Sequence, residues 1–370
     1  MQYTIDGFFD SKYVRSHSVE TIKTYKTCLK KFEEFLKHSY QCSLTDIIDQ
    51  IKEKKIDVYE VLRDFVINQD RLGYSPRTVE LRVNAAKEYL RYCGIKIYSE
   101  DFKQTVKLPR KIKAVEVPLT KEVILRVLRN VSPKLQAVIL VATATGMRIG
   151  ELVQLKISDI HFEVEPTKIH LRAETTKTRT PRVVFLTKES TQALKDYLGR
   201  YHNWDEKNQE QIKDKIVFGR TSISNNLYKK DSELKTHWVA AAETLLQKSL
   251  LRAIRKVADL NVKNSNQMQS IHFHAFRKFH RTIVGNAVGQ DFAENMLGHS
   301  SAANIYYQLS EQEKIKLYLK AEPNLTISDF KTVEKSFEEL SNKNQTLENK
   351  IENIMNYLKQ NSLPVPTNVI

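Results

Sequence analysis

The apolar positions in the N-terminal part of the chain recur with the period of amphipathic helices. From Ser18 to Lys37 they lie three and four residues apart, with lysines and glutamates between them. A second such stretch runs from Val58 to Val66. A third follows a serine and Pro76, a pair typical of a helix start, and ends at Gly94. These stretches predict a helical domain over residues 1–101.

A basic segment without this periodicity comes next, and we expect a linker over residues 102–118. Its residues 102–114 hold Pro109 and no acidic residue. One interpretation is a solvated linker, and the other is a basic tether that follows DNA phosphates between two DNA-binding domains. The candidate DNA-binding residues of this segment are Lys103, Lys107, Arg110, Lys111 and Lys113.

The pattern then predicts a mainly helical domain over residues 119–323 with one strand region. Residues 169–172 and 182–186 are β-type runs, and the polar, threonine-rich bend between them predicts a hairpin with a basic tip. The longest apolar run, Leu135 to Ala144, is far shorter than the roughly 18 to 20 residues of a membrane-spanning helix. It therefore predicts a buried helix. The expected fold class is mainly α with a small antiparallel β-sheet.

The C-terminal segment, residues 328–360, carries a different pattern. From Val333 to Leu358 the apolar positions alternate between spacings of four and three, with Asn344 at an a position of the heptad. Five lysines face six acidic residues here, so the basic excess of the chain lies elsewhere. The pattern predicts a coiled-coil helix that pairs subunits. The alternative is one amphipathic helix folded onto its own core.

Length, charge and cysteines narrow the class of protein. A chain of 370 residues favours two or three domains, and a net charge of +15 suits a polyanionic partner, either nucleic acid or an anionic membrane surface. The basic residues are not gathered on one amphipathic anchor, which disfavours the membrane. Three cysteines without a C-x-x-C pair argue against a disulfide framework or a zinc site. With no signal-peptide pattern at the start, we expect a cytoplasmic protein.

Three short motifs carry candidate chemistry. In the first, an apolar helix runs into Thr145-Gly146, so Arg148 is expected at a tight turn beside the start of a new helix. In the second, His274 and Arg277 are three residues apart and share one face of a helix. The third is Leu297-Gly298-His299, followed closely by Tyr306 and Tyr307. Each motif alone has an ordinary structural explanation: surface charge, a structural histidine, or core aromatics.

Together and in this order, the motifs resemble the catalytic domain of the tyrosine recombinases, the class that includes phage integrases. Residues 145–152 match the family pattern Thr-Gly-x-Arg-x-x-Glu-Leu, and a hairpin lysine, His-x-x-Arg, Leu-Gly-His and a tyrosine follow. The resemblance covers about residues 119–322. The N-terminal domain is similar to the family's helical, SAM-like core-binding domain. In the family the two domains form a C-shaped clamp around duplex DNA.

The resemblance implies a role for each residue. Arg148 and Arg277 would stabilise the charge that develops on the phosphate, since arginine matches phosphate geometry. His274 would act as acid/base, His299 would hydrogen-bond the scissile phosphate, and Glu151 would support the arginine or the helix start. The proton for the departing 5′ oxygen would come from a lysine of the hairpin. Lys177 is the best match for that general acid, with Lys168 and Arg179 as alternatives.

The nucleophile is the one departure from the family pattern. Tyr306 and Tyr307 fall seven and eight residues after His299, where the best-known members have nine. A loop one residue shorter would bring Tyr307 into place, so Tyr307 is the expected nucleophile, Tyr306 the runner-up and Tyr318 a distant third. The paired tyrosines look more like those of archaeal integrases than bacterial ones.

The expected function is site-specific DNA recombination through a 3′-phosphotyrosine intermediate, with no metal, cofactor or ATP. The expected partners are double-stranded DNA and further copies of the chain, a tetramer at synapsis. A type IB topoisomerase shares this chemistry but swivels one strand as a monomer, so the heptad segment favours the recombinase. A catalytically inactive DNA-binding protein is the alternative from another class.

Overall fold

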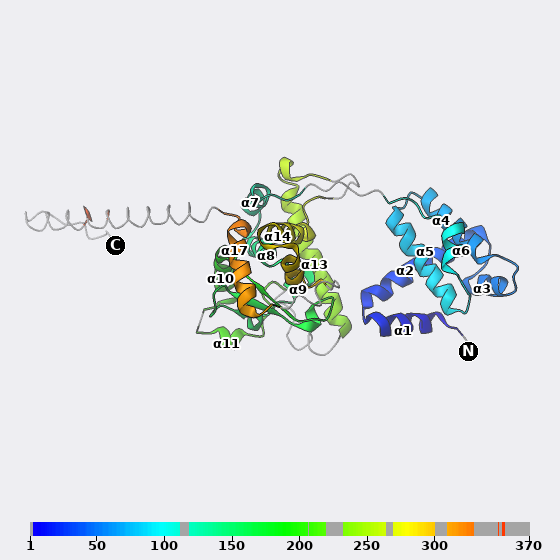
Figure 1. Ribbon diagram of the computed structural model, residues 1–370, viewed down its shortest axis with the longest axis horizontal. Coiled ribbons are helices and arrows are strands. Elements are labelled where there is room, and N and C mark those ends of the chain that lie inside the picture. The colour runs from blue at the N-terminus through cyan, green and yellow to red at the C-terminus, as the bar shows by residue number, and fades with distance from the viewer. Residues whose placement is uncertain are drawn as a thin grey trace, which may run out of the picture. The chain divides into compact units, whose positions relative to one another are not determined.

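The computed structural model describes residues 3–111, 118–205, 207–219, 232–263, 269–299 and 309–328, together with residues 347, 350 and 351. The chain divides into two compact units, Met1–Ala114 and Val115–Ile370, called unit 1 and unit 2 here. Figure 1 shows the elements of each unit. Within the described ranges, no helix is long and apolar enough to cross a membrane.

Unit 1 is built from helices alone in its described part. Its helices are α1 (Ile5–Ser16), α2 (Val19–Ser39), α3 (Leu44–Lys52), α4 (Val58–Arg71), α5 (Pro76–Tyr92) and α6 (Ser99–Thr105). The expected helix starts are confirmed, because Ser18 and Ser75 cap α2 and α5 by accepting hydrogen bonds from backbone N–H groups in the first turn. The core is rich in aromatic rings, with Phe32, Phe35 and Phe65 packed in a cluster.

The linker expected over residues 102–118 starts later than the sequence predicts. Phe102 and Val106 are only 7% and 3% exposed, and both belong to the core of unit 1. Leu108 packs against the same core. Lys103 and Lys107 are exposed, and because they alternate with these apolar positions, the sequence does not show a regular apolar pattern here.

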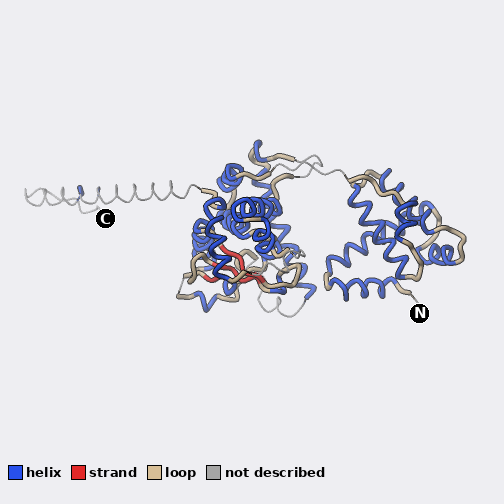
Figure 2. Tube along the Cα trace, in the orientation of Figure 1, coloured by secondary structure: helices blue, strands red, loops and turns tan. Residues whose placement is uncertain are grey.

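Unit 2 combines helices with one small sheet. Its helices are α7 (Lys121–Arg129), α8 (Pro133–Thr145), α9 (Ile149–Val153), α10 (Lys188–His202), α11 (Gln209–Ile212), α13 (Ser232–Ile254), α14 (Phe273–Val288), α15 (Gln290–Leu297) and α17 (Glu311–Leu325). The strands are β1 (Ile160–His161), β2 (Lys168–Leu171) and β3 (Arg182–Phe185), antiparallel in the order β1-β2-β3. Figure 2 shows the strands at one side of the helices of this unit. The predicted hairpin is confirmed, whereas the short β1 was not predicted.

The buried helix predicted from Leu135 to Ala144 is α8, and it forms the centre of unit 2. Every residue from Ala137 to Thr145 is buried. Helices α10, α14 and α17 pack against it. The core extends to Ile327, which is 5% exposed, so unit 2 continues past the expected end at residue 323. A helix this apolar on all sides is stable only when other elements cover it.

The predicted C-terminal heptad helix lies almost wholly outside the described residues. Only residues 347, 350 and 351 of that segment are described; all three are helical, and Leu347 and Ile351 are 55% and 43% exposed. The coiled coil therefore stays a prediction.

Candidate active site

The turn between α8 and α9 presents Arg148. Gly146 ends α8 with a φ of 64°, in the left-handed region that glycine tolerates. Its α-carbon sits tightly against neighbours, because a β-carbon there would lie 2.6 Å from Leu297 and 2.7 Å from His280. The chain then reverses, and Arg148 stands immediately before α9. The conformation predicted from Thr145-Gly146 is confirmed.

Glu151 holds Arg148 and a second arginine in place. Its carboxylate accepts a hydrogen bond from the backbone N–H of Arg148 at 2.8 Å and pairs with that guanidinium at 3.3 Å. It also pairs with Arg182 of β3 at 2.6 and 3.0 Å. Glu151 is 2% exposed. Burial alone would raise the pKa of Glu151, but the hydrogen bonds and charges of Arg182 and Arg148 lower it below its ordinary value. Glu151 is therefore an ionised carboxylate inside the unit.

Arg277 connects three segments beneath the site. On α14 it is 3% exposed, and its Nη1 donates to the carbonyl oxygen of Gly146 at 2.5 Å. Its Nη2 donates to the carbonyl oxygen of Leu297 at 2.7 Å and lies 2.9 Å from Nε2 of His299. Burial, then the charge of Arg148, lowers the pKa of Arg277 to about 9. Arg277 consequently stays charged at neutral pH.

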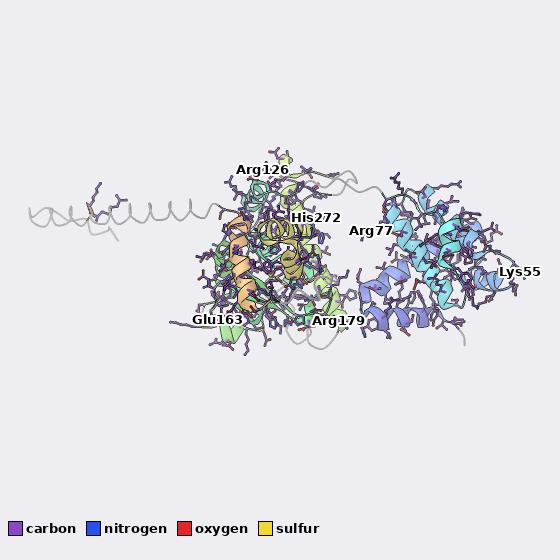
Figure 3. All side chains as sticks on the ribbon, viewed as in Figure 1. Lys55, Arg77, Arg126, Glu163, Arg179 and His272 are labelled. Atoms are coloured by element: carbon purple, nitrogen blue, oxygen red, sulfur yellow. The ribbon has the colours of Figure 1, made fainter. Side chains whose placement is uncertain are left out.

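His274 lies one turn before Arg277 on the same helix, as the spacing predicted. It is exposed where Arg277 is buried, so it faces outward from the core. Burial of part of its ring, followed by the charges of Lys278 and Arg277, lowers the pKa of His274. The imidazole is therefore neutral at pH 7 and available as a proton acceptor. His272, just before α14, and Arg179 at the hairpin tip are labelled in Figure 3.

Lys177 stands on the bend of the β2–β3 hairpin. The Thr176 hydroxyl lies 3.0 and 3.1 Å from the carbonyl oxygens of Ala173 and Thr180, and its single proton is donated to them across the bend. Lys168 lies on strand β2 rather than on the bend. Its ammonium group pairs with Glu311, the first residue of α17, at 2.8 Å.

These side chains meet at one cavity. It has a volume of about 430 Å³ and lies wholly within unit 2. Arg148, Lys177, His274 and Arg277 all line it, and neither Lys168 nor Arg179 does. Glu151 lines it as well, so the structure brings together five predicted residues from three separate stretches of sequence. Among the residues that the structure describes, no group of histidine, cysteine or acidic side chains could hold a metal ion.

The expected nucleophiles have different outcomes. Tyr306 and Tyr307 lie outside the described residues. Tyr318 is fully buried, and its hydroxyl donates to the carbonyl oxygen of Ala144 at 3.1 Å inside the core. Burial raises the pKa of Tyr318 well above its ordinary value. This tyrosine is a structural residue, so its place as a third candidate nucleophile was wrong.

The candidate DNA-binding residues of the basic segment lie on the surface of unit 1, except Lys113, which is outside the described residues. Lys103, Lys107, Arg110 and Lys111 are exposed. Lys111 pairs with Glu80 of α5 at 2.5 Å, and Lys107 donates to the carbonyl oxygen of Lys103 at 2.9 Å. The side chain of Lys111 is exposed and that of Glu80 is half-buried, so solvent screens this ion pair, it contributes little to stability, and Lys111 can exchange Glu80 for another anion.

Three residues near the site were missed by the sequence reasoning: Arg182, His280 and Glu294. His280 is fully buried behind the Gly146 turn, where its Nδ1 lies 3.0 Å from the carbonyl oxygen of Thr143. Burial lowers the pKa of His280 to about 4, so it is neutral. No short motif contains these residues, although Arg182 begins a predicted strand and Glu294 precedes His299 by five residues.

Comparison with known proteins agrees with this geometry. The sequence model of the phage integrase family matches residues 118–313, more than half of the chain. The chain belongs to the phage integrase family.

Curated relatives include the tyrosine recombinase XerC of Chlamydia trachomatis serovar L2, 25% identical over 205 residues. That match covers 50% of this chain and 62% of XerC, so the chain spans less than two thirds of that relative. A tyrosine recombinase of Thermosipho africanus is 25% identical over 328 residues, 85% of this chain and 98% of that protein. The tyrosine recombinase XerA of Pyrococcus furiosus is 34% identical over 95 residues, 25% of this chain and 32% of XerA.

Among solved structures, the XerH site-specific recombinase bound to a palindromic difH substrate shares the fold, with a TM-score of 0.53 and 20% identity. The match covers 82% of this chain and 80% of XerH. It supports the predicted mainly helical fold class with a small antiparallel sheet.

Proposed function

We propose that this chain is a tyrosine-type site-specific DNA recombinase, which cuts and rejoins DNA strands through a 3′-phosphotyrosine intermediate. The observation that carries the proposal is the cavity that Arg148, Lys177, His274 and Arg277 share. Three cationic side chains and a neutral histidine at one cavity suit a phosphodiester under attack, whose oxygens gain negative charge. Membership of the integrase family, rather than a topoisomerase family, favours recombination over strand swivelling.

Each residue has a place in the reaction. The tyrosine oxygen attacks the scissile phosphorus, a bond forms between them, and the bond from phosphorus to the 5′ oxygen breaks. Arg148 and Arg277 stabilise the charge on the non-bridging oxygens, the charge stabilisation that a metal ion provides in other nucleases. Neutral His274 accepts the tyrosine proton, and Lys177 supplies a proton to the departing 5′ oxygen. Attack by the 5′ hydroxyl of another strand reverses these steps, and no ATP is consumed.

Tyr307 is the proposed nucleophile, with Tyr306 as the alternative. The support is sequence position, because both tyrosines follow His299 within eight residues and Tyr318 is excluded by its burial.

The proposed partners are double-stranded DNA and other copies of the chain, with a tetramer at synapsis. The XerH complex and the named recombinase relatives support the DNA partner. The exposure of Leu347 and Ile351 supports pairing through the C-terminal segment, since apolar heptad positions are buried only when a partner helix covers them. A DNA substrate is compatible with the proposed cytoplasmic location. The exposed basic residues after α6 are proposed to contact phosphates.

The test is a suicide-substrate assay with EDTA present: nicked duplex DNA carrying a proven recombination site, read as a covalent protein–DNA band on a denaturing gel. We expect a band for the wild type and for Tyr306→Phe, and none for Tyr307→Phe. The opposite pattern of the two variants moves the nucleophile to Tyr306 and keeps the function. No band for the wild type on a proven site refutes the proposed function and leaves a DNA-binding protein.

A further inference from the structure

A carboxylate stands directly behind His299, on the side away from Arg277. Nδ1 of His299 makes a hydrogen bond with the carboxylate of Glu294, from the last turns of α15. The other oxygen of that carboxylate accepts a hydrogen bond from Arg281 of α14. On the far edge of the imidazole, Nε2 lies 2.9 Å from Nη2 of Arg277. His299 is therefore held between an acidic and a basic side chain.

These two contacts define which ring nitrogen carries the proton. A neutral imidazole has one donor nitrogen and one acceptor nitrogen, whereas a guanidinium group only donates. Nε2 must accept from Arg277, so the proton is on Nδ1 and is donated to Glu294. Partial burial acts to raise the pKa of Glu294, but the hydrogen bonds from His299 and Arg281 outweigh it and lower this pKa below its ordinary value. The carboxylate is therefore ionised. An ionised carboxylate accepts this proton and cannot donate one in return.

This arrangement conflicts with the role that the resemblance implies for His299. A phosphate oxygen accepts hydrogen bonds, so His299 must donate to it from Nε2, the nitrogen that faces Arg277. Moving the single proton from Nδ1 to Nε2 would leave a lone pair facing the Glu294 carboxylate, which is repulsive. A second proton, taken from solvent onto Nε2, avoids that repulsion and gives a positively charged imidazolium.

We propose that Glu294 is a positioning residue for DNA cleavage. It holds His299 with a proton on Nδ1, and it stabilises the imidazolium that forms when Nε2 takes a second proton from solvent and then donates a hydrogen bond to the scissile phosphate. The proposal rests on the proposed function, because the phosphate is that of the cleaved DNA. Carboxylate–histidine pairs fix ring orientation and raise the basicity of the far nitrogen in the same way at metal sites.

The other charged groups around His299 make this carboxylate necessary. Arg277 and Arg281 face it from α14, and Arg182 of β3 packs against the adjacent Gly298, 3.0 Å from the position of a β-carbon there. An imidazolium here would stand beside three cations, and a carboxylate in contact with the ring offsets that repulsion. Glu294 is the carboxylate in direct contact with the ring. Its own pairing with Arg281 also reduces the effect of that cation.

The chain offers a matched control for this pair. His161 and Glu163 form a second histidine–glutamate pair in unit 2, with Nδ1 2.9 Å from the carboxylate. Glu163 does not line the cavity of the proposed active site, and it lies well apart from His272 in Figure 3. Glu163→Gln therefore makes the same chemical change at a place where no effect on cleavage is expected.

The experiment measures the rate of covalent-complex formation on the suicide substrate as a function of pH, for wild type, Glu294→Gln and Glu163→Gln. Glutamine keeps the size of the side chain and an acceptor oxygen but loses the charge. We expect the rate of Glu294→Gln to fall at a lower pH than that of wild type. At about pH 8.5 it should be about tenfold slower, the equivalent of 1.4 kcal/mol, and near pH 6 close to wild type. Glu294→Asp should keep the wild-type profile.

Equal pH profiles for wild type and Glu294→Gln would overturn the proposal, as would the same shift in Glu163→Gln. A second measurement does not depend on activity: nitrogen NMR of histidine-labelled protein without DNA, with His299 assigned from a His299→Gln spectrum. Wild type should show the proton on Nδ1, and a proton on Nε2 refutes the proposal. A wild type with no cleavage activity but an Nδ1 proton would instead refute the proposed function and leave the Glu294–His299 pair as described.

Discussion

Replacing Glu151 by glutamine tests whether the buried charges behind the active site also stabilise unit 2. The carboxylate is 2% exposed and pairs with Arg182, whose side chain is 9% exposed, and with Arg148. Removing one partner of a buried ion pair leaves the other charge uncompensated, at a cost of about 3 kcal/mol. Glutamine keeps one acceptor for the backbone N–H of Arg148. We therefore expect the free energy of unfolding to fall by about 3 kcal/mol rather than by about 5 kcal/mol.

The assay is urea unfolding followed by tryptophan fluorescence. Trp204 and Trp238 are the two tryptophans of the chain, and both lie in unit 2, so the signal reports the unfolding of that unit. Glu210→Gln is the control. Glu210 is paired with Lys213 at 3.1 Å on the surface, where an ion pair contributes at most about 1 kcal/mol.

The sign of the pH dependence follows from the lowered pKa of Glu151. A carboxyl group with a lower pKa in the folded than in the unfolded state stabilises the fold above its unfolded pKa, and that contribution is lost as the pH falls through the folded pKa. The difference between wild type and Glu151→Gln should therefore be constant at neutral pH and shrink in acid. A variant as stable as Glu210→Gln at pH 7, or a difference that grows in acid, would refute the reasoning.

Two further predictions concern the hairpin and the Gly146 turn. Lys177→Met should abolish cleavage of ordinary DNA, whereas Lys168→Met should not. A substrate with sulfur in place of the bridging 5′ oxygen should restore cleavage by Lys177→Met, since a thiolate leaves without a general acid. In the covalent-complex assay, an equal loss of cleavage in the two lysine variants would contradict the assignment of Lys177 as the general acid. Gly146→Ala should destabilise unit 2 by about 1 to 3 kcal/mol in the tryptophan assay. Alanine is strained at a φ of 64°, and its β-carbon would contact His280. An unchanged free energy of unfolding would contradict the requirement for glycine at this turn.

The parts of the molecule that local sequence predicts are those set by neighbouring residues. Ser75 with Pro76 marks the start of α5, and Thr145-Gly146 marks the turn that presents Arg148, because capping and a left-handed φ depend on a few adjacent residues. The β2–β3 hairpin follows from alternation and turn composition in the same way. Helix α6 was missed because Phe102 and Val106 are isolated apolar positions among lysines.

The supporting residues of the site were beyond such reasoning, because their partners are distant in sequence. Arg182 and Glu151 are 31 residues apart, and Arg277 and the carbonyl oxygen of Gly146 are 131 apart. Which charged side chain meets which depends on how α8, α14 and β3 pack, and that packing is decided by the apolar core rather than by the charges. The family resemblance supplied Glu151 and the other predicted residues that line the cavity, but not Arg182 or Glu294.

The carboxylates of Glu151 and Glu294 explain how several arginine side chains can lie close together before DNA binds. Arg148, Arg182, Arg277 and Arg281 would repel one another strongly in a low-dielectric interior if they were alone. Glu151 pairs with both Arg148 and Arg182, and Glu294 pairs with both Arg281 and His299. Glu151 lines the cavity with only 2% of its surface exposed, and Glu294 binds His299 on the ring edge opposite Arg277, so each acid stabilises cations with which it is already paired. Phosphate oxygens that enter the cavity then meet cations whose positions are already fixed by folding.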